Sequence, residues 1–197
     1  MTAASVSSPV ASPAIRLAGP DEPWGVLATD LARLAALIAR LDDAAFRAAP
    51  VGAFESSIGH HVRHCLDHVH ALLVAAEFPA EDTALDYDDR RRGTQAETDR
   101  AAALTLLSSL QRRALSMRGS DPLRPLRVRV LLTRSGLTAE VQTSLGRELT
   151  FVLGHATHHH AIIAAMARTM GVEVPADFGV AASTAAFREK GRCDRTH

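Results

Sequence analysis

The sequence has very little cysteine, few aromatic residues and no net charge. It contains 197 residues with only two cysteines, Cys65 and Cys193, 4% aromatic side chains, and 22 Lys and Arg residues against 22 Asp and Glu residues. Two cysteines are too few for a disulfide-stapled scaffold. A neutral chain lacks the basic surface of nucleic-acid-binding proteins. The low content of aromatic side chains argues against a surface on which the bases of a single strand could stack. We therefore expect no nucleic-acid partner.

The sequence also lacks a long unbroken hydrophobic run. Residues 1–20 are rich in Ala, Ser and Pro and match neither a secretory signal nor a membrane anchor, so we expect a flexible N-terminal tail and no membrane association. With 47% hydrophobic and 22% charged residues, the chain has the composition of an ordinary folded domain. A reducing cytoplasm is the simplest setting for this cysteine content.

Four long segments carry apolar residues at intervals of three and four, which is the period of an amphipathic helix. The predicted helices span residues 22–41, 57–77, 94–117 and 144–170. Ser56 and Ser57 are suited to cap the second helix. Thr94 and Glu97 form a capping-box pattern at the third. Helices of this length pack well on one another, so we predict an all-α fold, a four-helix up-and-down bundle.

Residues 126–133 and 137–143 alternate between apolar and polar side chains, which is the period of a strand. The Ser-Gly pair at 135–136 is a turn signal and predicts a small β-hairpin between the third and fourth helices. The expected register places Val130 opposite Val141.

The predicted domain organisation is a tail over 1–20, a bundle over 21–171 and a C-terminal extension over 172–197, whose periodicity is too weak to place.

Nine of the ten histidines fall in two short windows, on the second and fourth predicted helices: His60, His61, His64, His68 and His70, then His155, His158, His159 and His160. Imidazole is the commonest nitrogen ligand for transition metals. Polar packing or surface histidines would explain one such cluster. Two clusters on different helices favour a metal site shared between them.

His155 and His159 are the strongest ligand candidates, because residues four apart lie on one helix face and this face also carries apolar residues. We expect them to point into the bundle. On the second helix His61, His64 and His68 form one stripe. The inward-facing donor is one of these three, and we choose His64.

Four further residues are candidates for an auxiliary role near the metal: His61, Asp67, His68 and His158. Asp67 lies one turn beyond His64, where a carboxylate can fix the tautomer of an imidazole. His160 is rotated by about 100° from its neighbour on the helix and should point away from the site. Cys65 should also diverge, and we interpret it as a buried apolar residue.

Three histidines with an open fourth position describe a catalytic metal centre better than a structural one. Zn or Ni are the first choices, with Fe or Mn as alternatives, and the open position would activate water or a thiolate. Ala156 stands where a zincin motif needs glutamate, and neither histidine-bearing helix shows the ExxH pattern of di-iron carboxylate bundles. Ligation of a haem by one histidine from each helix is a further alternative.

An up-and-down order makes the helices over 57–77 and 144–170 run in the same direction. The site would then lie beneath the hairpin, as a lid, rather than beneath the charged 78–93 loop. Gly59 and Gly154 each precede a histidine cluster, and we interpret both as points of close helix approach.

The segments SIGHHVRHCLDH and LGHATHHHAII resemble the DinB-like (DinB/YfiT-like) family of metalloenzymes, and the resemblance covers roughly residues 24–170. It implies a four-helix bundle, a metal site formed by His64, His155 and His159, and assembly as a homodimer. Members include thiol-dependent transferases that use mycothiol or bacillithiol, and hydrolases.

The expected function is therefore that of a divalent-metal-dependent enzyme acting on a small-molecule substrate, of the thiol transferase or hydrolase type, with a low-molecular-weight thiol as cosubstrate in the first case. The sequence assigns no catalytic residue. The alternative is a metal-binding or stress-response bundle protein without turnover.

Overall fold

The computed structural model describes residues 22–49, 55–78, 84–89 and 93–193. Within these ranges the chain is mainly helical with a small sheet, which confirms the predominantly helical class. The predicted tail over 1–20 lies outside the described residues. In the described part of the chain, no helix combines the length and the apolar character needed to cross a bilayer.

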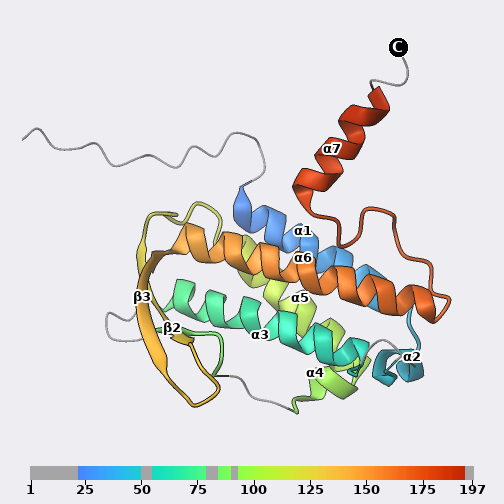
Figure 1. Ribbon diagram of the computed structural model, residues 1–197, viewed down its shortest axis with the longest axis horizontal. Helices are drawn as coiled ribbons and strands as arrows, with labels where there is room; N and C mark the ends of the chain where they lie inside the picture. Colours follow the sequence, from blue (N-terminus) through green and yellow to red (C-terminus); the bar gives the residue numbers. More distant parts are fainter. Residues whose placement is uncertain (1–21, 50–54, 79–83, 90–92, 194–197) are drawn as a thin grey trace, which may run out of the picture.

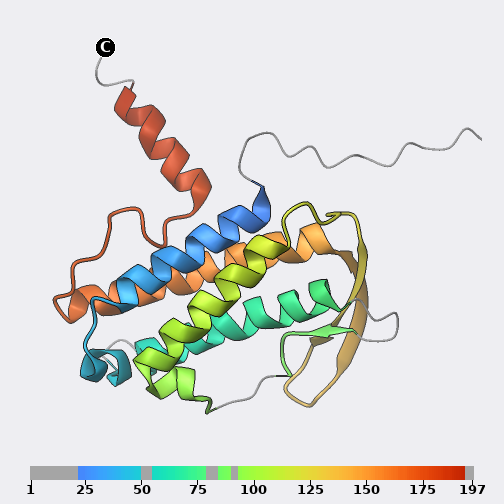
Figure 2. The same ribbon diagram turned by 180° about the vertical axis from the view of Figure 1, so that it is seen from behind.

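Four long helices form the body of the molecule: α1 (Pro23–Ile38), α3 (Ile58–Glu77), α5 (Arg100–Ser116) and α6 (Leu145–Thr169). α1 and α3 each pack against both α5 and α6 (Figures 1 and 2). The short helices α2 (Asp43–Arg47) and α4 (Gln95–Thr98) lie near the start of α3, and α7 (Ala182–Cys193) projects away from the body (Figure 1). α1, α3 and α6 match the predicted segments to within three residues, whereas α5 begins six residues after the predicted start at 94.

The core lies between these four helices, and each of them contributes side chains less than 2% exposed: Leu27, Leu34, Leu66, Leu72, Leu107, Leu110, Leu145 and Ile163. Burying one such side chain stabilises the fold by about 1.5–3 kcal/mol. The stripes that predicted the helices are therefore the faces that hold them together.

The order of helix directions is not up-and-down, because α3 and α5 run in the same direction. Near the start of α3, Arg63 Nε lies 2.8 Å from Glu97 Oε2, just ahead of α5. At the far end of both helices, Arg113 Nη2 donates to Glu77 Oε2 at 2.7 Å. The connection between α3 and α5 therefore returns the chain to the end where α3 began (Figures 1 and 2). Helical periodicity does not predict the path of a connection. The predicted up-and-down order of the four long helices is therefore wrong.

α6 consequently runs antiparallel to α3. His61 near the start of α3 meets His159, and His64, further along α3, meets His155, which is earlier on α6. The expectation that these two helices share a direction is wrong, yet the two histidine clusters still meet because the first half of α3 lies against the middle of α6.

The helix starts follow local capping chemistry. Ser57 Oγ accepts a hydrogen bond from His60 N and begins α3, as expected. The capping box at Thr94 does not form: its side chain makes no cap hydrogen bond, and the helix breaks at Asp99. Asp99 Oδ1 accepts from Ala102 N and starts α5 as a separate helix.

The sheet comprises β1 (Leu85–Asp86), β2 (Pro125–Leu131) and β3 (Thr138–Ser144) in that order. β2 and β3 pair antiparallel with Val128 opposite Val141, a register two residues away from the predicted one. The reason is a four-residue turn, in which Gly136 N donates to Thr133 O at 3.1 Å, in place of a two-residue turn. A shift of two leaves each side chain on its expected face.

β1 pairs parallel with β2 and comes from the connection between α3 and α5, where the sequence predicted only a charged loop. The next residue, Tyr87, is 9% exposed and lies against α3 through His68. The site therefore borders this connection, so the prediction that it lies beneath the hairpin and away from the 78–93 segment is wrong.

The two glycines that precede the histidine clusters behave differently. A Cβ on Gly59 would collide with the carbonyl of Glu97 and the ring of Phe46, which confirms a close approach of α4 and α2 to α3. A Cβ on Gly154 would meet nothing within 4 Å. The prediction of close packing at Gly154 is therefore wrong.

Candidate metal centre

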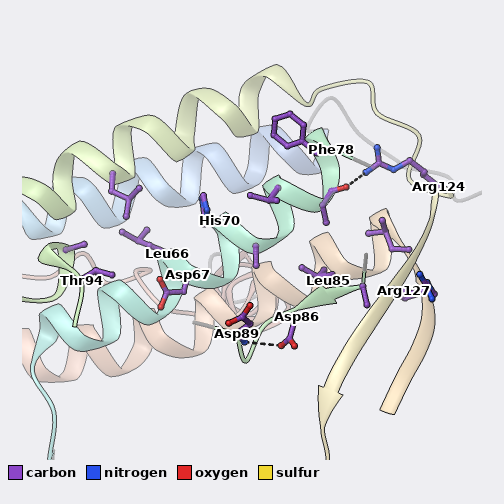
Figure 3. A pocket seen from close by; sticks show the side chains of 18 of the residues that line it. Leu66, Asp67, His70, Phe78, Leu85, Asp86, Asp89, Thr94, Arg124 and Arg127 are labelled. Carbon is purple, nitrogen blue, oxygen red and sulfur yellow. Dashed lines mark hydrogen bonds between the residues drawn. The ribbon is translucent and has the colours of Figure 1, made fainter. Parts of the chain in front are cut away.

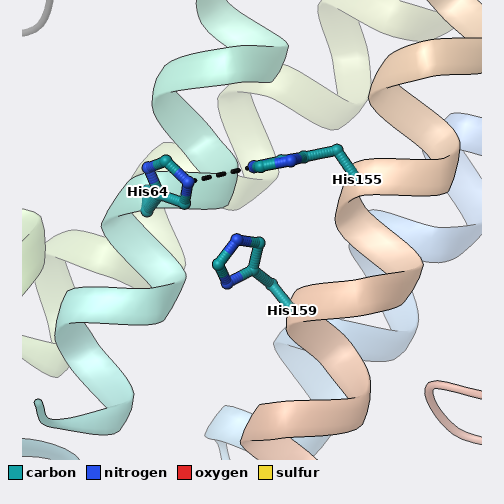
Figure 4. Close-up of side chains that lie close together, drawn as sticks. All are labelled: His64, His155 and His159. Atoms are coloured by element: carbon teal, nitrogen blue, oxygen red, sulfur yellow. Dashed lines mark hydrogen bonds between the residues drawn. The ribbon is translucent and has the colours of Figure 1, made fainter. Parts of the chain in front are cut away.

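His64, His155 and His159 converge between α3 and α6 (Figure 4). Each offers one nitrogen, and these nitrogens all lie within 4.8 Å of one another. The Nε2 atoms of His64 and His155 are 3.0 Å apart. All three side chains are partly buried. The structure thus brings together the three residues that the sequence favoured as ligands.

The donor set fits a transition metal. A tetrahedral zinc ion with bonds of 2.0–2.1 Å to imidazole nitrogens separates neighbouring nitrogens by about 3.3 Å. The observed separation of 3.0 Å between His64 and His155 is close to that value, and the nitrogen of His159 lies within 4.8 Å of both. Imidazole suits Zn, Ni, Fe and Cu better than it suits Mg or Ca. The arrangement can therefore hold a divalent transition metal.

His61 contacts the third candidate ligand. Its Nδ1 lies 3.1 Å from Nδ1 of His159, and its Nε2 lies 2.9 Å from Ser56 Oγ. In Figure 4 the other ring nitrogen of His159 points toward His64 and His155. Since the contact with His61 uses Nδ1, the nitrogen that faces the other two rings is Nε2.

His68 packs against the second candidate ligand. Its ring stacks on His155 with centroids 4.0 Å apart and on Tyr87 with centroids 5.1 Å apart. Its Nδ1 is 3.0 Å from the backbone oxygen of His64 and donates to it. The stacked rings of His68 and Tyr87 thus hold the ring of His155 in place. The sequence did not point to Tyr87, because no helical spacing relates it to the histidines.

A buried carboxylate ties this stack to the rest of the fold. Glu148 is 1% exposed and accepts hydrogen bonds from Tyr87 Oη at 3.0 Å, Thr143 Oγ1 at 2.8 Å and Arg147 Nη1 at 2.9 Å. Three donors compensate the carboxylate for its loss of water. Glu148 therefore joins the 84–89 segment, β3 and α6, and its spacing from the histidines gave no hint of this role.

The other residues singled out from the sequence take separate positions. His158 is exposed and meets the His159 ring edge-on, with centroids 5.2 Å apart. Asp67 accepts a hydrogen bond from Arg63 at 2.6 Å, a pairing that involves no imidazole.

His160 points away from the candidate ligands, as expected, and stacks on Phe178 with centroids 5.0 Å apart. Cys65 is 2% exposed, and burial raises the pKa of its thiol. It is the buried residue that the sequence suggested.

A polar cavity of about 540 Å³ opens beside the candidate ligands. It is lined by Ser56, His60, His61, Arg63, His64, Gly93, Glu97 and His159. Glu97 pairs here with Arg63 Nε at 2.8 Å and with His60 Nδ1 at 3.4 Å. A small polar molecule can therefore reach the side of the site formed by His64 and His159.

A larger cavity of about 1250 Å³ lies on another face of α3 (Figure 3). Its described lining comes from α3, α4, α5 and the sheet, and includes Leu66, Asp67, His70, Leu85, Leu106 and Arg124. The three candidate ligands are not among these lining residues. The smaller cavity, and not this one, gives access to the candidate metal centre.

Burial lowers the pKa of His159 from its ordinary value of 6.5 to about 3, and the neighbouring imidazoles of His155, His61, His158 and His68 lower it further in the same direction. A protonated imidazole cannot bind a metal, whereas a neutral one keeps a lone pair. His159 is therefore neutral, and able to coordinate, over the whole physiological range.

Comparison with known proteins gives two findings. A protein-family model for the DinB superfamily matches residues 27–163. The chain is also similar to a protein named FK506-binding protein 5 from Rhizopus delemar, with 36% identity over 103 residues, which is 52% of this chain and 27% of that protein. The chain thus matches only about a quarter of that relative.

The family match begins in α1 and ends in α6, so it includes all of α3 and α5 and most of α1 and α6. It also contains His64, His155 and His159. Because it spans well over half of the chain, the protein belongs to the DinB superfamily.

Proposed function

We propose that this protein is a divalent-metal-dependent enzyme of the thiol transferase or hydrolase type. The observation that carries the proposal is the convergence of three imidazole nitrogens within 4.8 Å, beside a cavity of about 540 Å³. Three protein ligands leave a coordination position free, which is typical of catalytic zinc sites and not of structural ones. When bound in such a site, a metal supplies Lewis-acid activation of a water molecule or a thiol.

In this proposal His64, His155 and His159 hold the metal, and His61, His68 and Tyr87 hold two of those rings in place. The low pKa of His159 supports the assignment, because this ring stays neutral without help from the metal. Zn or Ni are the preferred metals, since all three donors are imidazoles.

The rest of the proposal concerns the surroundings of the site. A polar cavity of about 540 Å³ suits a small-molecule substrate, and a low-molecular-weight thiol is the proposed cosubstrate of the transferase reaction. A buried Cys65 that forms no disulfide with a described residue is compatible with a cytoplasmic setting. Assembly as a homodimer completes the proposal and is to be tested by the mass of the protein in solution.

The test is a screen of metal-loaded protein against electrophiles with low-molecular-weight thiols, and against esters and amides. His159→Ala should abolish any turnover found. His70→Ala is the matched control, because His70 is exposed and contacts Arg113 on α5. Turnover that survives in His159→Ala would contradict the proposal. Tight metal binding with no turnover in the whole screen would favour the alternative, a metal-binding protein without catalysis.

A further inference from the structure

We propose that His61 is a positioning residue, whose Nδ1 accepts a hydrogen bond from Nδ1 of His159 and thereby directs Nε2 of His159 toward the metal. This inference rests on the metal site of the proposed function and deepens it. It is carried by the contact of 3.1 Å between the two Nδ1 atoms and by the orientation of His159 in Figure 4.

The contact between two ring nitrogens requires that one of them carries the hydrogen and the other does not. If Nδ1 of His61 carried it, a neutral His159 would have its own hydrogen on Nε2. That nitrogen faces His64 and His155 (Figure 4) and would then be unable to coordinate. If Nδ1 of His159 carries the hydrogen, its Nε2 presents a lone pair to the other two rings. Metal binding therefore selects the second arrangement.

The second ring nitrogen of His61, Nε2, has a partner that fits this arrangement. When Nδ1 of His61 is the acceptor, a neutral His61 carries its hydrogen on Nε2. That atom lies 2.9 Å from Ser56 Oγ, which can accept it. Ser56 precedes Ser57, the residue that caps the start of α3. The chain of hydrogen bonds from His159 through His61 thus ends at a fixed point of the fold.

This use of both ring nitrogens also separates His61 from the ligands. Its Nδ1 faces His159 and its Nε2 faces Ser56, so neither is directed to the point where the other three imidazoles converge. A partner that accepts the second N–H of a ligating imidazole fixes its tautomer and ring orientation, and removing such a partner typically lowers metal affinity about 10–100-fold.

A matched pair of variants tests the inference. In His61→Asn the side-chain oxygen occupies the position of Nδ1, because both atoms are two bonds from Cβ, and it can accept from His159. His61→Leu has similar branching and no acceptor. We expect the affinity of His61→Leu for Zn²⁺ alone, measured by competition with a chromogenic chelator, to fall about 10–100-fold. His61→Asn should stay within about threefold of the wild type.

Equal losses in the two variants, or a wild-type affinity in His61→Leu, would overturn the inference. Thermal unfolding of the metal-free variants reports whether each is folded. Should His61→Leu fail to fold, the zinc-loaded wild type labelled with [¹⁵N]histidine decides the matter: the ¹⁵N resonances should show His159 with its hydrogen on Nδ1, and a hydrogen on Nδ1 of His61 would refute the assignment.

The same titration separates this inference from the proposed function. Zinc binding that is abolished by His64→Ala and unchanged by His61→Leu would remove only the positioning role. A wild-type protein that binds no zinc, or binds it equally well in His64→Ala, would overturn both.

Discussion

The α1–α5 and α3–α6 helix pairs share one core but differ in what they bury. Every buried side chain of α1 and α5 is apolar. The buried side chains of α3 and α6 include Arg63, His68, Glu148 and His160, and the candidate ligands lie partly buried between these two helices. An apolar interface would be simpler and at least as stable. We infer that α1 and α5 support the fold, whereas α3 and α6 carry a site that folding alone does not require.

The polar interface is kept in order by specific partners. His61 has Ser56 and His159, His68 donates to a backbone oxygen, and Glu148 has three donors. Each buried polar group that lost its partner would destabilise the fold by about 1–3 kcal/mol. Each prediction below concerns one helix pair or the other, and the predictions run from the largest expected effect to the smallest.

Removal of one candidate ligand should have the largest effect. In His155→Ala, elemental analysis of protein purified without a tag should find the metal content reduced from about one ion per chain to nearly none, because two imidazoles hold a transition metal weakly. His70→Ala should keep its metal. An unchanged metal content in His155→Ala would remove this residue from the site.

A truncation in the apolar pair should affect stability and leave the metal in place. Leu34 on α1 is fully buried, so Leu34→Ala should lower the free energy of unfolding by about 2–5 kcal/mol, as measured by chemical denaturation. The metal content per folded chain should not change. A loss of metal from the folded variant would mean that the two helix pairs are not independent.

Acid should destabilise the interface between α3 and α6. The pKa of His159 is about 3 in the folded protein and 6.5 ordinarily. Below pH 6.5 this residue is therefore protonated in the unfolded chain and still neutral in the folded chain. The free energy of unfolding of the metal-free protein should fall as the pH drops from about 6.5 toward 3. Bound metal should also dissociate below about pH 6, because a protonated imidazole cannot coordinate.

Denaturation midpoints of the metal-free protein at several pH values measure this effect, and His159→Asn supplies the control, because it should show a shallower pH dependence. Full retention of the metal at about pH 4 would speak against three histidine ligands.

The two glycines should give the smallest effects, of opposite sign. Gly154→Ala should raise the free energy of unfolding by about 0.5–1 kcal/mol, because alanine is the better helix former and a Cβ meets nothing there. Gly59→Ala should lower it by about 1–3 kcal/mol, since a Cβ would collide with Glu97 and Phe46. Thermal unfolding of the two variants tests this, and equal shifts would contradict it.

The sequence was sufficient for the four long helices and for the meeting of the two histidine clusters. Both follow from local periodicity: spacing by four sets His155 and His159 on one face, and the apolar stripe of the same helix turns that face inward. Imidazole chemistry then predicts a metal. Spacing alone left His61, His64 and His68 as candidates on α3, and the family resemblance implied the same choice of His64.

Three of the features that the sequence did not predict depend on contacts between distant segments. The parallel course of α3 and α5 depends on the path of the connection, which has no period to detect. Tyr87 and Glu148 meet across 61 residues of chain. The pairing of His61 with His159 depends on the tautomer and side-chain orientation of both rings, which only three-dimensional placement reveals.

The most direct test of the central claim is a crystal structure of the protein loaded with zinc, with anomalous scattering data collected at the zinc absorption edge. We expect one strong anomalous peak between the nitrogens of His64, His155 and His159, about 2.0–2.1 Å from each. A peak elsewhere, or no ordered zinc between α3 and α6, would contradict it.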